Sequence, residues 1–152
     1  PIGLLSVDID GNDYWVWKAI HCVEPVIVVA EYNSLMGPER AITVPYDPAF
    51  VRSRAHWSRM YYGASITALT QLASAKGYAL VGSNSAGNNA YFVRRDRLRE
   101  LREVRPEAAW VDSRFRERER DGTPHRIRGQ ERREAIAGLA VVDVVSGQTE
   151  RL

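Results

Sequence analysis

Two short stretches of this chain end in oxygen-bearing side chains that could bind a cation or accept a proton. They are LLSVDID, residues 4–10, and VIVVAEYN, residues 26–33. The side chains in question are those of Asp8, Asp10, Glu31 and Asn33. Oxygen ligands of this kind suit a hard cation such as Mg²⁺ or Ca²⁺ and not zinc. Alternatively, one carboxylate acts as a general base, its pKa raised by the neighbouring negative charges.

The elements that must position these side chains are two strands and a helix. Apolar residues predict fully buried strands over 3–9 and 26–32, and the spacing of aromatic residues predicts a helix over 13–22. Strand, helix and strand within about 30 residues form a right-handed βαβ unit with parallel strands. Asn12 or Asp13 would cap the helix.

Ligands of open parallel sheets bind outside the carboxyl ends of the strands. Residues two apart in a strand point to the same face, so Asp8 and Asp10 should aim together. We therefore expect Asp8 and Asp10 to be catalytic. A metal ion would be bound by Asp8, Asp10, Glu31 and Asn33.

Residues 33–62 are expected to form one long, lid-like loop, because Pro45 and Pro48 prevent a regular helix there. Loops of this length in compact domains are usually functional or mobile. Its aromatic side chains could wall a small-molecule pocket or pack in the interior. The tyrosines expected to contact a substrate are Tyr14, Tyr32, Tyr46 and Tyr62.

The rest of the chain divides at residue 94. A helix over 63–77, with Ser65 as its cap and Gly77 as its stop, precedes strands at 78–83 and 90–95 joined as a hairpin. These complete a unit over 1–94. Residues 95–152 are expected to form an Arg-rich arm packed on the same domain. Its predicted helices cover 95–104 and 130–139, and its terminal strand covers 140–144.

Composition excludes several classes of protein. With 45% apolar and 26% charged residues, the 152-residue chain is typical of a globular domain, and no apolar run is long enough to span a membrane. The single Cys22 excludes an internal disulfide and favours a reducing, cytoplasmic setting. Residues 94–133 carry 14 Arg against 9 Asp and Glu. Because these charges interleave, they indicate a solvated surface, and a nucleic-acid partner is not expected.

Several segments together resemble the C-terminal half of FkbM-type methyltransferases. They are LLSVDIDGNDYWVW, VIVVAEYN, VPYDPAF, YYGASITALTQLASAKGYALVGSNSAGNNAYFVRRD and ERREAIAGLAVVDVVSG. The resemblance covers nearly the whole chain but only half of the family's domain. It implies a Rossmann-like α/β half-domain in which residues 4–9 are the fourth strand, 26–32 the fifth, and 78–95 the closing antiparallel hairpin.

The resemblance also implies an activity, which is transfer of a methyl group from S-adenosylmethionine to an oxygen of a small acceptor. Such enzymes keep acceptor-side chemistry at the exit of the fourth strand, which maps onto Asp8 and Asp10. Metal-dependent relatives use an Asp there and an Asp-Asn pair after the fifth strand. The comparable residues here are Glu31 and Asn33, with Tyr32 inserted between them.

The cofactor-binding elements of the family have no counterpart in this sequence. No strand is followed by a glycine-rich turn and a helix, and no acidic residue is placed to grip a ribose. We therefore expect the chain to be a fragment or a decayed domain that binds S-adenosylmethionine poorly by itself. The alternative is a non-catalytic binding or assembly module, in which the sheet edge at 4–9 pairs with a partner or a second copy.

Overall fold

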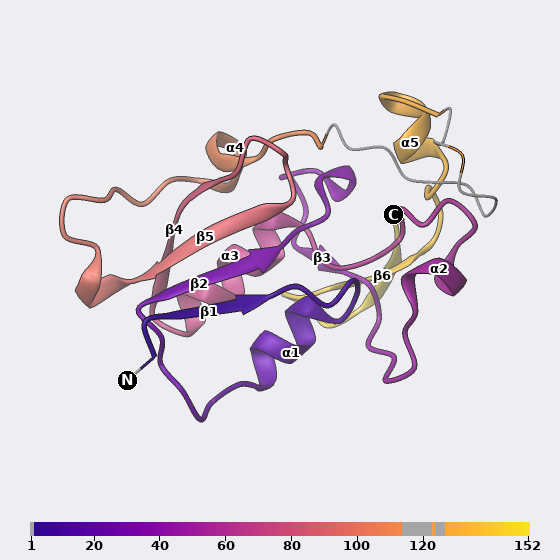
Figure 1. Ribbon diagram of the computed structural model, residues 1–152. Helices are drawn as coiled ribbons and strands as arrows, with labels where there is room; N and C mark the ends of the chain where they lie inside the picture. The colour runs from indigo at the N-terminus through magenta and orange to yellow at the C-terminus, as the bar shows by residue number, and fades with distance from the viewer. Residues whose placement is uncertain (1, 114–122, 124–126) are drawn as a thin grey trace.

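The computed structural model of the chain describes residues 2–113, 123 and 127–152 (Figure 1). Its main element is a mixed four-stranded sheet in the order β1-β2-β5-β4. The strands are β1 (Leu4–Val7), β2 (Ile27–Glu31), β4 (Tyr78–Ser83) and β5 (Asn89–Arg94). The protein is therefore of the mixed α/β class.

The parallel pair and the hairpin follow the prediction. β1 and β2 run parallel, with Leu4 opposite Ile27 and Val7 opposite Ala30, and helix α1 (Asp13–Ala19) connects them. β4 and β5 form the antiparallel hairpin, and it is the second of them, β5, that pairs with β2. β4 therefore runs in the same direction as β1 and β2 but stands at the far edge.

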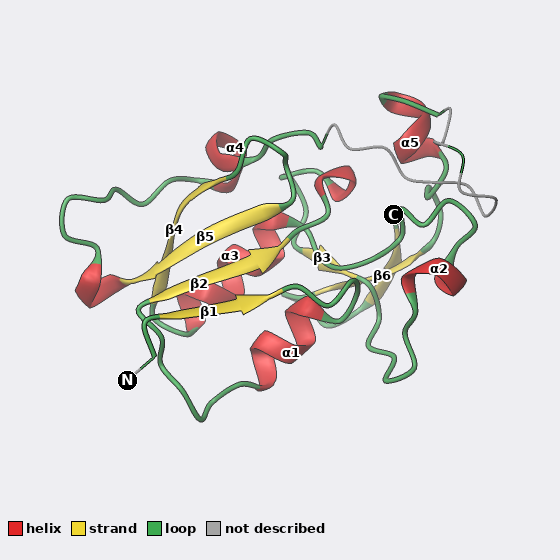
Figure 2. Cartoon of the chain, in the orientation of Figure 1, coloured by secondary structure: helices red, strands yellow, loops and turns green. Residues whose placement is uncertain are grey.

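Helices α1 and α3 (Ile66–Ala75) pack on one face of this sheet (Figure 2). The core between them contains Trp17, Val28, Leu69 and Phe92, all 2% exposed or less. Ser65 caps α3 as predicted, since its Oγ accepts a hydrogen bond from the Ala68 N–H at 3.0 Å. Apolar spacing that is local in the sequence was thus sufficient to find these two helices.

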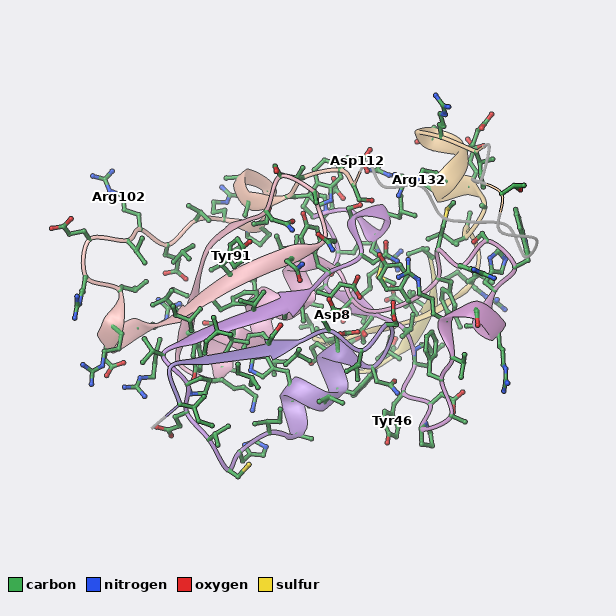
Figure 3. The ribbon with its side chains drawn as sticks, in the orientation of Figure 1. Asp8, Tyr46, Tyr91, Arg102, Asp112 and Arg132 are labelled. Atoms are coloured by element: carbon green, nitrogen blue, oxygen red, sulfur yellow. The ribbon has the colours of Figure 1, made fainter. Side chains whose placement is uncertain are left out.

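Strand β1 is not fully buried, which corrects one prediction. It pairs only with β2 and so forms an edge of the described sheet, and Leu4 is 55% exposed while Val7 is buried. The face opposite the helices is only partly covered, and Tyr91 of β5 lies on it (Figure 3). The apolar run 4–9 matches a strand covered on both faces, but among the described residues only one face is covered.

Residues 33–62 are not one open loop. They contain a 3₁₀ turn η1 (Ser34–Met36), strand β3 (Ile42–Thr43) and a single helical turn α2 (Arg52–Ala55). β3 joins β6 (Ala140–Asp143) and β7 (Thr149–Arg151) in a second, antiparallel sheet of order β3-β6-β7. The first part of the segment is thereby anchored in a core with Ile42 and Val141, and Phe50 packs against the same core.

The Arg-rich arm has less helix than predicted. The expected helix over 95–104 is only a 3₁₀ turn, η2 (Arg95–Arg97), followed by irregular chain. The described helices of the arm are α4 (Pro106–Ala109) and α5 (Gln130–Glu134). Residues 114–122 and 124–126, part of the irregular arm of the prediction, lie outside the described residues. Within the described part of the chain, no helix is both long and apolar enough to cross a membrane.

Candidate carboxylate site

Three carboxylates converge where the two parallel strands end. Asp8 follows β1, Glu31 ends β2, and Asp13 begins α1. One oxygen of each lies within 4.8 Å of the oxygens of the other two. In Figure 3, Asp8 lies at the exit of β1, next to the end of β2. The predicted meeting of Asp8 and Glu31 at one edge of the sheet is therefore seen in the structure.

Glu31 is the most unusual of the three. It is only 5% exposed, and its Oε2 has no hydrogen-bond partner among the described residues. The pKa of this carboxyl is raised from 4.5 to about 8, mainly by burial and in addition by the negative charges of Asp8 and Asp13. Arg52 opposes that increase. Without a cation, Glu31 is therefore mostly protonated at neutral pH.

The prediction that Asn12 or Asp13 caps α1 was wrong, because the N-cap side chain of Asn12 makes no capping hydrogen bond and Asp13 is the first residue of the helix. Asp13 is fully buried, and its two oxygens accept hydrogen bonds from the backbone N–H groups of Ile9 and Gly11, both at 2.9 Å. Burial raises the pKa of Asp13, while these two hydrogen bonds lower it. Asp13 thus fixes the turn after β1 and contributes a carboxylate to the site.

Asp10 does not join the cluster. The strand ends at Val7, and Asp10 adopts a left-handed backbone conformation with φ +57°. The alternation that would have placed Asp10 beside Asp8 therefore does not apply. Its Oδ1 instead accepts a hydrogen bond from Arg52 Nη1 at 2.8 Å, and its side chain is 63% exposed.

Asn33 is also unsuited to bind a metal. Its side-chain NH₂ donates to the carbonyl oxygens of Met60 and Tyr62 at 2.8 and 3.0 Å. Its Oδ1 accepts from the Leu35 N–H at 3.1 Å and so caps η1. The residue is 1% exposed. Asn33 therefore holds the segment after β2 against residues 60–62 and leaves the ligand set to the three carboxylates.

The four tyrosines do not wall a common pocket. Tyr14 and Tyr32 are 5% and 0% exposed in the main core, and the Tyr32 hydroxyl donates to the Val111 carbonyl oxygen at 3.0 Å. Tyr62 is 3% exposed, and the Arg52 guanidinium lies 3.7 Å from the centre of its ring. Tyr46 is exposed and lies at the periphery (Figure 3). Their hydroxyls therefore serve structure or solvent and not a shared ligand.

The site fits a divalent cation and does not fit a nucleotide cofactor. Cation–oxygen bonds of about 2.3–2.6 Å allow two ligand oxygens to lie up to about 5 Å apart, a range that includes the separations seen here. A cofactor would need an open glycine turn. At Gly11, the glycine after β1, an added Cβ would lie 2.2 Å from Phe50 Cδ1. A protein side chain already fills that space, so the turn after β1 cannot form such a cradle.

The protein is a mixed α/β domain with a cluster of two buried carboxylates and one exposed carboxylate at the ends of parallel strands. Comparisons with protein families, with curated proteins and with solved structures give no match to this chain. Its function must therefore be inferred from the residues and their geometry.

Proposed function

We propose that this chain supplies the acceptor side of an S-adenosylmethionine-dependent O-methyltransferase that acts on a small molecule. The observation that carries the proposal is the convergence of Asp8, Asp13 and Glu31 outside two parallel strands, where a buried Glu31 oxygen has no hydrogen-bond partner among the described residues. Polar groups at such strand ends are the usual ligand-binding groups of open α/β sheets. The closing antiparallel hairpin, which the family resemblance implies, also supports it.

The cofactor would be bound by residues outside these 152, because the chain has no glycine-rich cradle. S-adenosylmethionine would supply the methyl group. The single exposed thiol, Cys22, fits the reducing cytoplasm in which we place the protein.

Asp8, Asp13 and Glu31 would hold a divalent cation, Mg²⁺ or Ca²⁺. Such an ion supplies Lewis acidity that lowers the pKa of a bound hydroxyl. The three carboxylates favour its binding because they repel one another, and Glu31 would exchange its proton for the ion. Asp8 is the most exposed member of the cluster, so an acceptor would meet it first.

In the absence of a cation, Glu31 would act as the general base. A carboxylate with a pKa of about 8 accepts a proton from a hydroxyl more readily than an ordinary one, provided that it is ionised. Its ionised fraction rises as the pH approaches 8, so this form of the reaction would accelerate with pH. In both cases Asp13 holds the turn that carries Asp8.

The test begins with cation binding by the chain itself. We expect calorimetric titration with Ca²⁺ and Mn²⁺ to show one site, and Asp8→Asn to weaken it at least about tenfold because one of three charged ligands is lost. Asp10→Asn is the matched control, since it removes a carboxylate two residues away that is paired with Arg52. Equal losses in both variants would mean that only general negative charge attracts the ion.

The reaction is then tested with the complete reading frame that encodes this chain. Asp8→Asn should leave S-adenosylmethionine binding intact and abolish methyl transfer to the acceptor. Full turnover by that variant would remove Asp8 from the mechanism.

A second candidate function is favoured by the edge of the sheet. β1 leaves its outer edge unpaired among the described residues, and exposed apolar side chains flank it: those of Ile2, Leu4 and Ile9. Such an edge is a template for pairing with another chain. The protein would then be an assembly module whose partner is a second copy of itself.

Sedimentation velocity distinguishes this candidate. An assembly module should associate as its concentration rises, and Leu4→Lys should make it monomeric, because a charged edge residue discourages strand pairing. Leu101→Lys is the control, since Leu101 is also 55% exposed but lies outside every strand. A wild-type chain that stays monomeric at high concentration would exclude self-assembly through β1.

A further inference from the structure

A separate pocket lies beside the carboxylate cluster. It has a volume of about 420 Å³ and lies between the turn after β1, at Ile9 and Asp10, and the segment 50–59 that contains α2. This volume falls within the range of small-molecule sites. Asp10 is two residues from Asp8, and Ile9 of the pocket lining donates its backbone N–H to Asp13 of the cluster at 2.9 Å. A ligand in this pocket would therefore be next to the cluster.

One wall of the pocket is cationic. Arg52 is held in place, because its Nη1 donates to Asp10 at 2.8 Å and its Nε donates to the Arg59 carbonyl oxygen at 2.8 Å. Arg59 is half-buried, and its guanidinium has no hydrogen bond or ion pair with any residue that the structure describes. Among the described lining residues, the two arginines and Asp10 carry a net charge of +1.

The remainder of the lining is largely apolar. Ile9 and Val51 are 49% and 42% exposed, and the Phe50 ring packs against Gly11. Apolar side chains that stay exposed around one cation match a ligand with an apolar body and a single negative charge. A monoanionic carboxylate fits the charge of the wall better than a dianionic phosphate, and a guanidinium can bind both of its oxygens.

We infer that this pocket binds a small carboxylic acid with an apolar or aromatic body, its carboxylate on Arg59 and its far end toward Asp8 and Glu31. The naming of this acid as the methyl acceptor rests on the proposed function. The binding site itself rests only on the pocket and its charges. An acceptor of this class would carry a hydroxyl on the side opposite its carboxylate.

The test uses benzoate, 4-hydroxybenzoate and phenylacetate as probes at millimolar concentration, followed by NMR of the arginine Nε–H signals. We expect saturable shifts of the Arg59 signal for at least one acid and none for 4-hydroxybenzamide, which has the same shape without the charge. Arg59→Gln should weaken binding roughly tenfold, while Arg59→Lys should retain part of it. Arg54→Gln is the control, because Arg54 is exposed on α2 and does not line the pocket.

The outcomes separate this inference from the proposed function. Absence of binding by all three acids, or equal binding by the amide or by Arg59→Gln, would overturn the inference. Loss of cation binding in Asp8→Asn together with unchanged benzoate binding would support two distinct sites. If the acids bind but the chain binds no cation, the inferred acid-binding pocket is supported and the proposed cation site is wrong.

Discussion

Replacing Glu31 with Gln is expected to stabilise the protein at alkaline pH and to leave it nearly unchanged at acid pH. The folded-state pKa of Glu31 is raised from 4.5 to about 8, so the folded chain holds a proton that the unfolded chain releases. The contribution of Glu31 to the free energy of unfolding is therefore fully present below about pH 4.5 and is lost as the pH rises through about 8. Gln is close to Glu in shape and carries no charge at any pH, so the variant keeps this stability as the pH rises.

The size of the effect follows from the shift. Each unit of pKa difference corresponds to about 1.4 kcal/mol, so Glu31→Gln should raise the free energy of unfolding by about 3–5 kcal/mol above about pH 8. Urea unfolding across the pH range, with a chelator present, measures it. The free energy of unfolding of Glu31→Gln should change little over the pH range in which that of the wild type declines.

Glu24→Gln is the matched control: the Glu24 side chain is 85% exposed and Glu31 is retained, so this variant should keep the wild-type decline of stability with pH. A cation gives a second comparison. Ca²⁺ added near pH 8 should raise the stability of the wild type, which then ionises Glu31 around the ion, but not that of Glu31→Gln. Parallel declines of wild type and variant with pH would show that Glu31 does not hold the proton.

Local sequence pattern was enough to predict the scaffold of the site. β-branched residues in 26–32 and the apolar run before Asp8 define the parallel strands, and the ends of those strands place Asp8 and Glu31 together. The closing hairpin follows from the turn residues between β4 and β5. Each of these features depends on neighbours in the sequence.

What could not be predicted depends on residues far apart. Asp10 leaves the cluster because the turn after Val7 takes a left-handed residue, and its partner Arg52 is 42 residues away. Asn33 is engaged by the carbonyl oxygens of residues 60 and 62, which only the folded chain brings near. The sequence showed Asp13 as an acidic residue at a helix start, but an exposed helix cap and a buried carboxylate look identical in sequence.

The exposure of β1 also depends on residues far apart in the sequence. An apolar strand sequence shows that its side chains can be covered, but it does not say which element covers each face. Here α1 covers one face of β1, and Leu4 remains exposed. The second sheet was missed for a related reason, since β3 is only two residues long and finds its partner, β6, about 100 residues later.

Replacing Asp13 with Ala should destabilise the protein, in contrast to the change at Glu31 in the same cluster. Asp13→Ala removes the acceptor of two backbone N–H groups, those of Ile9 and Gly11, at a fully buried position. A hydrogen bond to a charged group contributes about 1.5–3 kcal/mol, while removal of a neighbouring negative charge relieves Glu31. We expect a net loss of about 2–4 kcal/mol near neutral pH.

Two comparisons make this result specific. Asp47→Ala removes a similar hydrogen bond, from the Ala49 N–H to Asp47 Oδ1 at 2.8 Å, but at an exposed site, so its cost should be about 1 kcal/mol or less. Asp13→Ala should also make the decline of stability with pH shallower, because one of the charges that raises the pKa of Glu31 is gone. A variant as stable as the wild type, with an unchanged pH dependence, would mean that Asp13 neither holds the turn nor interacts with Glu31. Asp13 would then not be the residue that positions Asp8, and the proposal of a cation site would be wrong.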